Sequence, residues 1–310
     1  MATSSREDLQ KYLMPDYVDM SALQPPQVIE ELDFEVIFVE MLADFQARKP
    51  DYNALLESDP VVIALQCAAY RELLLRHRIN EAAKASMLAY AKGSDLDNLA
   101  AFYKVKRLVV DEGNPDSIPP ISPTYEDDDR LRLRTQLALE SFTTAGSEKA
   151  YFFHAYSASA KVKSLNVQSV VPGEVMITVL SNEGNGQADE ELLNTVLTYL
   201  SAEDKRPLTD KVKVQSAEII TYQIKARIFV YPGPSIPVVQ NEFETKLANY
   251  VAKRHKIGEV MAFSGIYEAL HGEGVQRVEL DSPTENIVTS STQAAYCSKV
   301  ELEVIVVDDK

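Results

Sequence analysis

The sequence comprises 310 residues, of which 45% are hydrophobic and 25% are charged, as in an ordinary soluble globular protein. Its formal net charge is -16, and this balance argues against DNA, RNA or an anionic membrane surface as the main partner, because like charges repel. We therefore expect no nucleic acid and no membrane among the partners of the chain.

The two cysteines, Cys67 and Cys297, are too few for a disulfide framework or a structural zinc site. Cys67 lies in an apolar helical stretch, so we expect it to be a small core residue. The opening stretch MATSSREDLQ lacks the apolar core of a signal peptide, and no apolar run approaches the length of a membrane span. These features predict a protein that folds in a reducing cytoplasm.

The N-terminal third is predicted to be helical, beginning with the stretch PPQVIEELDFEVIFVEMLADFQ. Pro25 and Pro26 mark the start of this helix. Its apolar residues cover a far wider arc than the roughly 100° that burial from one side requires. Such a helix needs neighbours on several sides, so its apolar residues are candidate contacts in an assembly: Ile29, Leu32, Val36, Phe38 and Phe45.

A second helix is predicted to begin at Pro60, where the missing N–H of proline costs nothing, and to run to about Ala91. Gly93 is expected to end it, and Ser94 and Asp95 are expected to cap a short helix that follows. At a rise of about 1.5 Å per residue, the second helix is much longer than the average helix of a globular protein. A helix of this length has more surface than one small domain can cover.

A charged pair, Glu72 and Arg76, interrupts an otherwise apolar side of this second helix, and its members lie one helical turn apart. The pair either takes part in catalysis or fixes the register in which the helix docks onto another surface. Arg78 and Asn80 follow closely, and Asn80 is one turn beyond Arg76, where it can add a hydrogen bond. We include all four residues in the candidate assembly interface.

Residues 109–126, VVDEGNPDSIPPISPTYE, are predicted to be a linker, because the segment is rich in Pro, Ser, Asp and Gly. The acids that follow it, Asp127, Asp128 and Asp129, have two explanations. They either complement the dipole of a helix, each contributing about 0.3–1 kcal/mol, or hold a divalent cation. The first explanation is simpler, and the second leaves an acidic metal-dependent hydrolase as the alternative function.

The rest of the chain mixes strands and helices, and Ser147 is expected to cap a helix over SEKAYFFHAYSA. Alternating polar and apolar residues predict strands, and longer amphipathic stretches predict helices. The predicted strands are VKSLNVQSVV, EVMITVLS, VKVQSAEI, YQIKARIFVY, VQRVEL and KVELEVIVV, and the predicted helices are ADEELLNTVLTYLS, VVQNEFETKLANYVAKRH and FSGIYEALHGEG. This order predicts an α+β fold in which a region of long helices precedes mixed or antiparallel sheets.

Motifs that would indicate chemistry are missing from the sequence. The four histidines have no paired-ligand spacing, and there is no glycine-rich dinucleotide fingerprint, Walker loop or nucleophile elbow. The stretch SNEGNGQADEE lacks the register of a calcium loop and is predicted to be a flexible turn. We therefore expect no catalytic residue, no metal and no cofactor.

Several stretches, in collinear order over nearly the whole chain, are similar to the patterns of the baseplate assembly protein J family of contractile-tail phages and related contractile particles. They are ALQPPQVIEELDFE, SDPVVIALQCAAYRELLLRHRINEAAKASMLAYAKGSDLDNLA, GSEKAYFFHAYSAS, VPGEVMITVLSNEGNGQAD, RPLTDKVKVQSAEIITYQI and IGEVMAFSGIYEALHGEGVQRVELDSP.

This resemblance implies a structural, non-enzymatic wedge subunit of the baseplate, which assembles around the central hub and links wedges into a ring. In related wedges, two copies of the chain bundle their N-terminal helices with a second wedge protein. The expected partners are a second copy of the chain and other wedge proteins, with the sheath-initiator and the hub or spike proteins as further candidates. The implied location is a virion or phage-tail-like particle, assembled in the bacterial host cytoplasm.

The resemblance and the residue pattern together predict three parts: a helical bundle-forming region (residues 1–108), a linker (109–126) and an α+β domain for wedge-to-wedge contacts (127–310). In such a bundle, Glu72 and Arg76 are a registry device, because breaking a buried ion pair costs about 3–5 kcal/mol although its net contribution is small. A soluble adaptor that binds its partners transiently through the long helix is the third class of function that fits the sequence.

Overall fold

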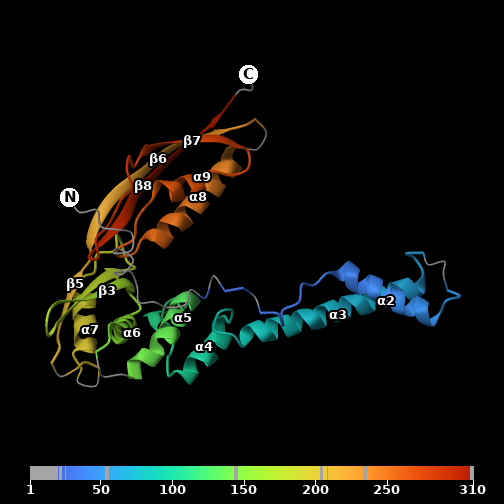
Figure 1. The fold of residues 1–310 in the computed structure, drawn as a ribbon, viewed down its shortest axis with the longest axis horizontal. Coiled ribbons are helices and arrows are strands. Elements are labelled where there is room, and N and C mark those ends of the chain that lie inside the picture. Colours follow the sequence, from blue (N-terminus) through green and yellow to red (C-terminus); the bar gives the residue numbers. More distant parts are fainter. Residues whose placement is uncertain are drawn as a thin grey trace. The chain divides into compact units, whose positions relative to one another are not determined.

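The structure is a computed structural model that describes residues 20, 23–24, 26–52, 56–142, 146–202, 205–207, 209–232 and 236–307 (Figure 1). The chain divides into two compact units. The helical unit comprises Val18–Lys106 and Asp127–Thr135, and the sheet unit contains Arg107–Glu126 and Gln136–Lys310. The chain therefore crosses between the units more than once. The three-part division at residues 1–108, 109–126 and 127–310 stays a prediction.

The helical unit is built from α2 (Phe34–Arg48), α3 (Pro60–Ala85), α4 (Gly93–Phe102) and most of α5 (Asp128–Leu137). The predicted start of the first helix is wrong, because residues 26–33 are not helical, and Pro25 lies outside the described residues. The carboxylate of Asp33 accepts hydrogen bonds from the N–H groups of Glu35 and Val36. This cap, rather than a proline, fixes the first turn of α2.

The start of α3 confirms the prediction, since Pro60 is its first residue and Asp59 caps the Val61 N–H. Its predicted end near Ala91 is wrong. Helix α3 stops at Ala85 after 26 residues, because the N–H and the hydroxyl of Ser86 both turn back to the carbonyl of Ala83. A side chain that binds the backbone in this way competes with the next helical turn.

In the sheet unit, residues 107–126, which include the predicted linker, form a loop whose two ends are hydrogen-bonded to each other. Strands β1 (Val109–Asp111) and β2 (Thr124–Tyr125) pair antiparallel. Glu126 joins the two ends of this loop. Its N–H donates to the Leu108 carbonyl at 3.0 Å, and its carboxylate accepts a hydrogen bond from the Leu108 N–H at 3.0 Å. Its carbonyl also accepts a hydrogen bond from Arg107 at 2.7 Å.

A first sheet has the order β3-β4-β5, with β3 and β4 antiparallel and β4 and β5 parallel. Two helices pack on it, and a 3-10 helix precedes them. The bounds are β3 (Val162–Val171), β4 (Glu174–Ser181), β5 (Lys211–Ser216), η2 (Ala138–Phe142), α6 (Glu148–Ala158) and α7 (Glu190–Leu200). Ser147 caps α6, as predicted, and β3 and β4 match the predicted strands residue for residue.

A second sheet has the order β7-β6-β8, with β7 antiparallel and β8 parallel to the central strand. Helices α8 and α9 cover one of its faces (Figure 1). The bounds are β6 (Glu218–Val230), β7 (Val275–Ser282), β8 (Gln293–Val306), α8 (Ile236–Arg254) and α9 (Phe263–Leu270). From Tyr222 to Val230, every second residue of β6 enters the core beside Phe243 and Leu247 of α8, as a half-buried strand requires.

The chain is therefore an α+β protein whose N-terminal part is helical and whose later part carries mixed sheets, as the sequence predicts. None of the helices within the described residues combines the length and the apolarity that a membrane span needs.

Candidate assembly interface

Helices α2 and α3 pack against each other through a small set of side chains. Ile37 of α2 and Val62 and Ala69 of α3 are buried. The aromatic rings of Phe34 and Phe38 stack along α2 with their centroids 6.2 Å apart. The packing of α2 on α3 leaves several large apolar side chains exposed, among them Val36 and Val39 of α2.

The side chain of Asn80 ties α3 to the extended segment that leads into α2. Its amide donates to the carbonyl of Glu30 at 2.8 Å and accepts the N–H of the same residue at 3.1 Å. Asn80 is only 5% exposed, so this two-way pairing satisfies an amide that would otherwise be buried without partners. The contact fixes Glu30 against the C-terminal half of α3.

The guanidinium of Arg76 collects two carboxylates next to this contact. Its Nε donates to Glu72 Oε1 at 2.9 Å, and its Nη1 lies 3.5 Å from Glu30 Oε2. The hydrogen bond to Glu72 is the main cause that raises the pKa of Arg76, and the charges of Glu72, Glu30 and Glu40 act in the same direction. The side chains of Arg76 and Glu72 remain 38% and 33% exposed, so the pair is only partly desolvated in the single chain.

Five large apolar side chains of α3 are exposed, on sides other than the one that it buries against α2. Ile63, Tyr70 and Leu74 follow one line of the helix at spacings of seven and four residues, and Leu75 and Ile79 lie farther around it. We call this set the apolar face of α3. Its five side chains are 41–62% exposed, although such large side chains are usually covered in a finished assembly.

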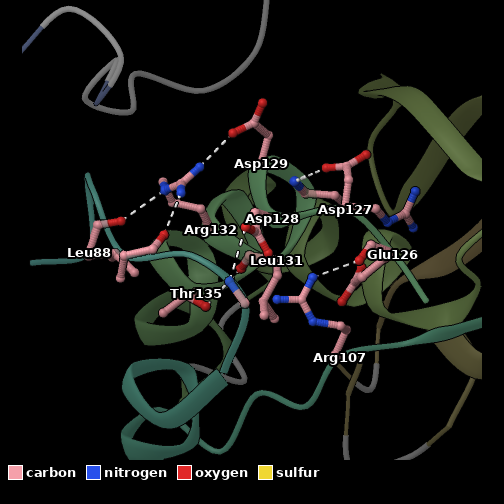
Figure 2. Close-up of polar contacts among 12 residues, drawn as sticks. Leu88, Arg107, Glu126, Asp127, Asp128, Asp129, Leu131, Arg132 and Thr135 are labelled. Carbon is pink, nitrogen blue, oxygen red and sulfur yellow. Dashed lines mark hydrogen bonds and ion pairs between the residues drawn. The ribbon is translucent and has the colours of Figure 1, made fainter. Parts of the chain in front are cut away.

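The carboxylates of Asp127, Asp128 and Asp129 point in different directions (Figure 2). Asp127 accepts the N–H of Arg130, Asp128 accepts the N–H of Gly93, and Asp129 pairs with a guanidinium. The Asp128 contact caps the N-terminus of α4, a task that the sequence assigned wrongly to Ser94 and Asp95. All three carboxylates are therefore engaged in contacts at the ends of helices.

A metal-dependent hydrolase receives no support from this arrangement. The guanidinium that pairs with Asp129 belongs to Arg132, whose remaining N–H groups donate to the carbonyls of Leu88 and Ala91 (Figure 2). Among the residues that the structure describes, no group of three or more His, Cys, Asp or Glu side chains is placed to hold a metal ion.

Three family models match successive stretches of the chain. The baseplate J-like N-terminal domain matches residues 57–114, the baseplate J-like central domain matches residues 143–216, and the baseplate J-like protein C-terminal domain matches residues 222–303. Baseplate protein J of Escherichia phage P2 is 44% identical over 289 residues, which cover 91% of this chain and 96% of that relative. The chain belongs to the baseplate J-like family. This membership supports a structural role in a phage baseplate and confirms the resemblance that the sequence motifs carry.

In this baseplate J-like chain, the three matches follow the architecture. The N-terminal model contains α3, α4 and β1, the central model contains the β3-β4-β5 sheet with α6 and α7, and the C-terminal model contains most of the second sheet with α8 and α9. The apolar face of α3 therefore lies within a region that is characteristic of the family.

The residues predicted for the interface are only partly brought together. Asn80, Arg76 and Glu72 form one continuous polar contact through Glu30, a residue that the sequence did not single out. Arg78 is exposed on the same helix. Among the apolar candidates, Val36 is exposed, whereas Ile29, Leu32, Phe38 and Phe45 are partly covered within the chain.

Most of the apolar face of α3 was not predicted from the sequence, and the prediction that Cys67 is a core residue is wrong. Cys67 is exposed on the same line as Ile63 and Tyr70, because α2 packs on another side of the helix. The recurrence of apolar residues at positions 63, 67, 70 and 74 was a readable signal. It could not reveal that the chain itself leaves this line uncovered.

Proposed function

We propose that the protein is a non-enzymatic wedge subunit of the baseplate of a contractile phage tail or phage-tail-like particle, where it assembles around the central hub and links wedges into a ring. Membership of the baseplate J-like family supports the baseplate role. The observation that carries the wedge assignment is the apolar face of α3, because a helix of 26 residues with five large apolar side chains uncovered needs further helices beside it.

The proposed partners are a second copy of the chain and other baseplate wedge proteins, with the sheath-initiator and the hub or spike proteins as additional neighbours. In this proposal, residues 1–108 supply the helical bundle, residues 127–310 make the wedge-to-wedge contacts, and residues 109–126 connect them. The protein then resides in the virion or particle after assembly in the bacterial host cytoplasm.

The polar contact at Glu30, Glu72, Arg76 and Asn80 acts in this proposal as the registry device of the bundle. Apolar helix faces slide past each other at little cost, whereas an ion pair that becomes covered must keep its partners. A partner helix that covers Arg76 in the wrong register would leave that charge buried without its carboxylates. The other interface candidates, which would add contacts elsewhere on this helical part of the chain, are Ile29, Leu32, Val36, Phe38, Phe45 and Arg78.

A matched pair of leucine substitutions tests the proposal. Leu75, on the apolar face of α3, and Leu139, in η2, are both 62% exposed, so an aspartate at either position is equally easy for the single chain to solvate. The full chain is co-expressed with the other baseplate proteins of its phage, and the amount of those proteins that co-purifies with it is measured. We expect Leu75→Asp to lower this amount at least tenfold, because burying an unpaired carboxylate is costly.

Leu139→Asp should leave co-purification within about twofold of the wild type, and circular dichroism should show that both variants are folded. Undiminished co-purification of the Leu75→Asp variant would contradict the assignment of this face to a helical bundle.

A further inference from the structure

A polar joint connects the two sheets of the sheet unit. On one face of β3, Ser164 Oγ accepts the N–H of Ile257 at 3.3 Å, and the amides of Asn166 and Gln168 each donate to Ser291 at 2.7 Å. A small apolar cluster of Leu180, Ala217, Ile257 and Ala294, with Ile219 packed against it, lies at this joint. The polar pairs next to this cluster are strong where they are shielded from water.

His255, which follows the C-terminus of α8, is enclosed in this joint and is only 8% exposed. Its Nδ1 lies 2.9 Å from the ammonium nitrogen of Lys163, on β3. An ammonium group has donors only, so while Lys163 is charged it donates in this contact and Nδ1 carries no proton. The contact therefore exists only while the imidazole is neutral.

The turn between β4 and α7 closes over the other nitrogen of the ring. Gly186 has a positive φ of 96°, and a Cβ at this position would lie 2.8 Å from His255 Nε2 and 2.7 Å from a methyl group of Leu180. Only a glycine can take this backbone conformation and also let the turn approach the ring so closely. The ring of Tyr296 on β8 lies 5.5 Å away on a further side.

The charges next to the ring are positive. Lys163 reaches it from β3 and Lys256 follows it in the chain, whereas Glu183 of the turn pairs with Lys161 and Glu259 pairs with Arg254. Burial, and then the charge of Lys163, lower the pKa of His255 to about 4. Burial, and then the charge of Lys256, lower the pKa of Lys163.

We propose that His255 and Lys163 form an acid-sensitive latch that holds the second sheet and its helices against the β3-β4-β5 sheet. A proton on Nδ1 removes the acceptor of the hydrogen bond and places two cations next to each other in a buried site. The joint then opens locally at Ser164, Ile257 and Ser291, and the imidazolium gains water.

The direction of the pH effect follows from the pKa of His255 in the open and in the closed joint. Its pKa is near the ordinary value of 6.5 when the joint is open and about 4 when it is closed, so the open form binds more protons in the window between these values. Closure is therefore at full strength above pH 6.5 and weakens progressively as the pH falls toward 4.

Hydrogen exchange of the full chain tests the latch at the amide of Ile257, which donates across the joint to Ser164 Oγ. Its protection, corrected for the intrinsic exchange rate, is compared between about pH 7.5 and about pH 5. We expect it to fall by up to about thirtyfold in the wild type, the ratio of the two protonation equilibria. His255→Gln, which retains an acceptor but cannot be protonated, should show a change of less than about threefold.

His271→Gln is the matched control, because His271 is exposed and should leave the full pH response in place. Lys163→Gln is a second test, which leaves the imidazole of His255 in place. It should also reduce the loss of protection at low pH. Equal loss of protection in the wild type, the His255→Gln variant and the Lys163→Gln variant would overturn the latch, as would constant protection of the wild type.

Discussion

The second sheet buries its large apolar side chains, whereas helix α3 leaves several of its own exposed. Strand β6 buries Ile224 and Ile228 completely under α8 and α9, so this part of the molecule closes its own core. Helix α3 buries Val62, Ala69 and Asn80 and exposes its apolar face. In the proposed function, the sheet supplies stability to the single chain, whereas the long helix supplies surface to an assembly.

The largest effect on stability is expected from alanine substitutions at two leucines, one of which is buried and the other exposed. Leu247 in α8 has no exposed surface, whereas Leu75 in α3 is 62% exposed. We expect Leu247→Ala to lower the free energy of unfolding by about 2–5 kcal/mol, through lost burial and a cavity. Leu75→Ala should change it by less than about 0.5 kcal/mol. Urea unfolding of the single chain measures both, and equal losses would remove the contrast between the two regions.

A smaller effect is expected where the helical unit does close a contact of its own. Asn80→Ala deprives the backbone groups of Glu30 of their partners, and we expect a loss of about 1–3 kcal/mol in the free energy of unfolding. Asn98, an exposed residue of α4 whose amide donates to the carbonyl of Ser94, is the matched control. Asn98→Ala should cost less than about 0.5 kcal/mol, and a similar cost for both asparagines would deny Asn80 its role.

The smallest effect on the single chain is expected at Arg76, whose ion pairs are open to solvent. Arg76→Ala should not shift the urea midpoint by a resolvable amount, since partly exposed pairs contribute little to stability. The same variant should still impair co-purification with other baseplate proteins, and the yield of intact particles in a complementation assay should fall. A normal particle yield from the Arg76→Ala variant would show that assembly does not need this ion pair.

The elements that the sequence predicted well are those specified by neighbouring residues. The alternation in VKSLNVQSVV and EVMITVLS defines β3 and β4 to the residue, and Ser147 caps α6 because the cap and the helix are adjacent. Both errors in the long helices occur where the chain departs from a continuous helical pattern. Asn80 holds the backbone of Glu30 extended across 50 residues of sequence, and the two turned-back hydrogen bonds of Ser86 end α3 inside an apparently helical stretch.

The sequence singled out three of the four residues in the polar contact of the helical unit but not the fourth. Glu72, Arg76 and Asn80 were among the predicted interface residues, whereas Glu30 joins them only in the folded chain. Asp128 caps α4 from 35 residues away, and Lys163 meets His255 from 92 residues away. Contacts of this range depend on how the elements pack, and local periodicity contains no information about them. The exposure of Cys67 was missed for the same reason.

The hydrogen bonds between Leu108 and Glu126 have a consequence for the segment that they enclose. They hold the two ends of residues 107–126 next to each other, whatever lies between them. A residue inserted near the exposed Ile118 would therefore lengthen the loop without moving its ends apart.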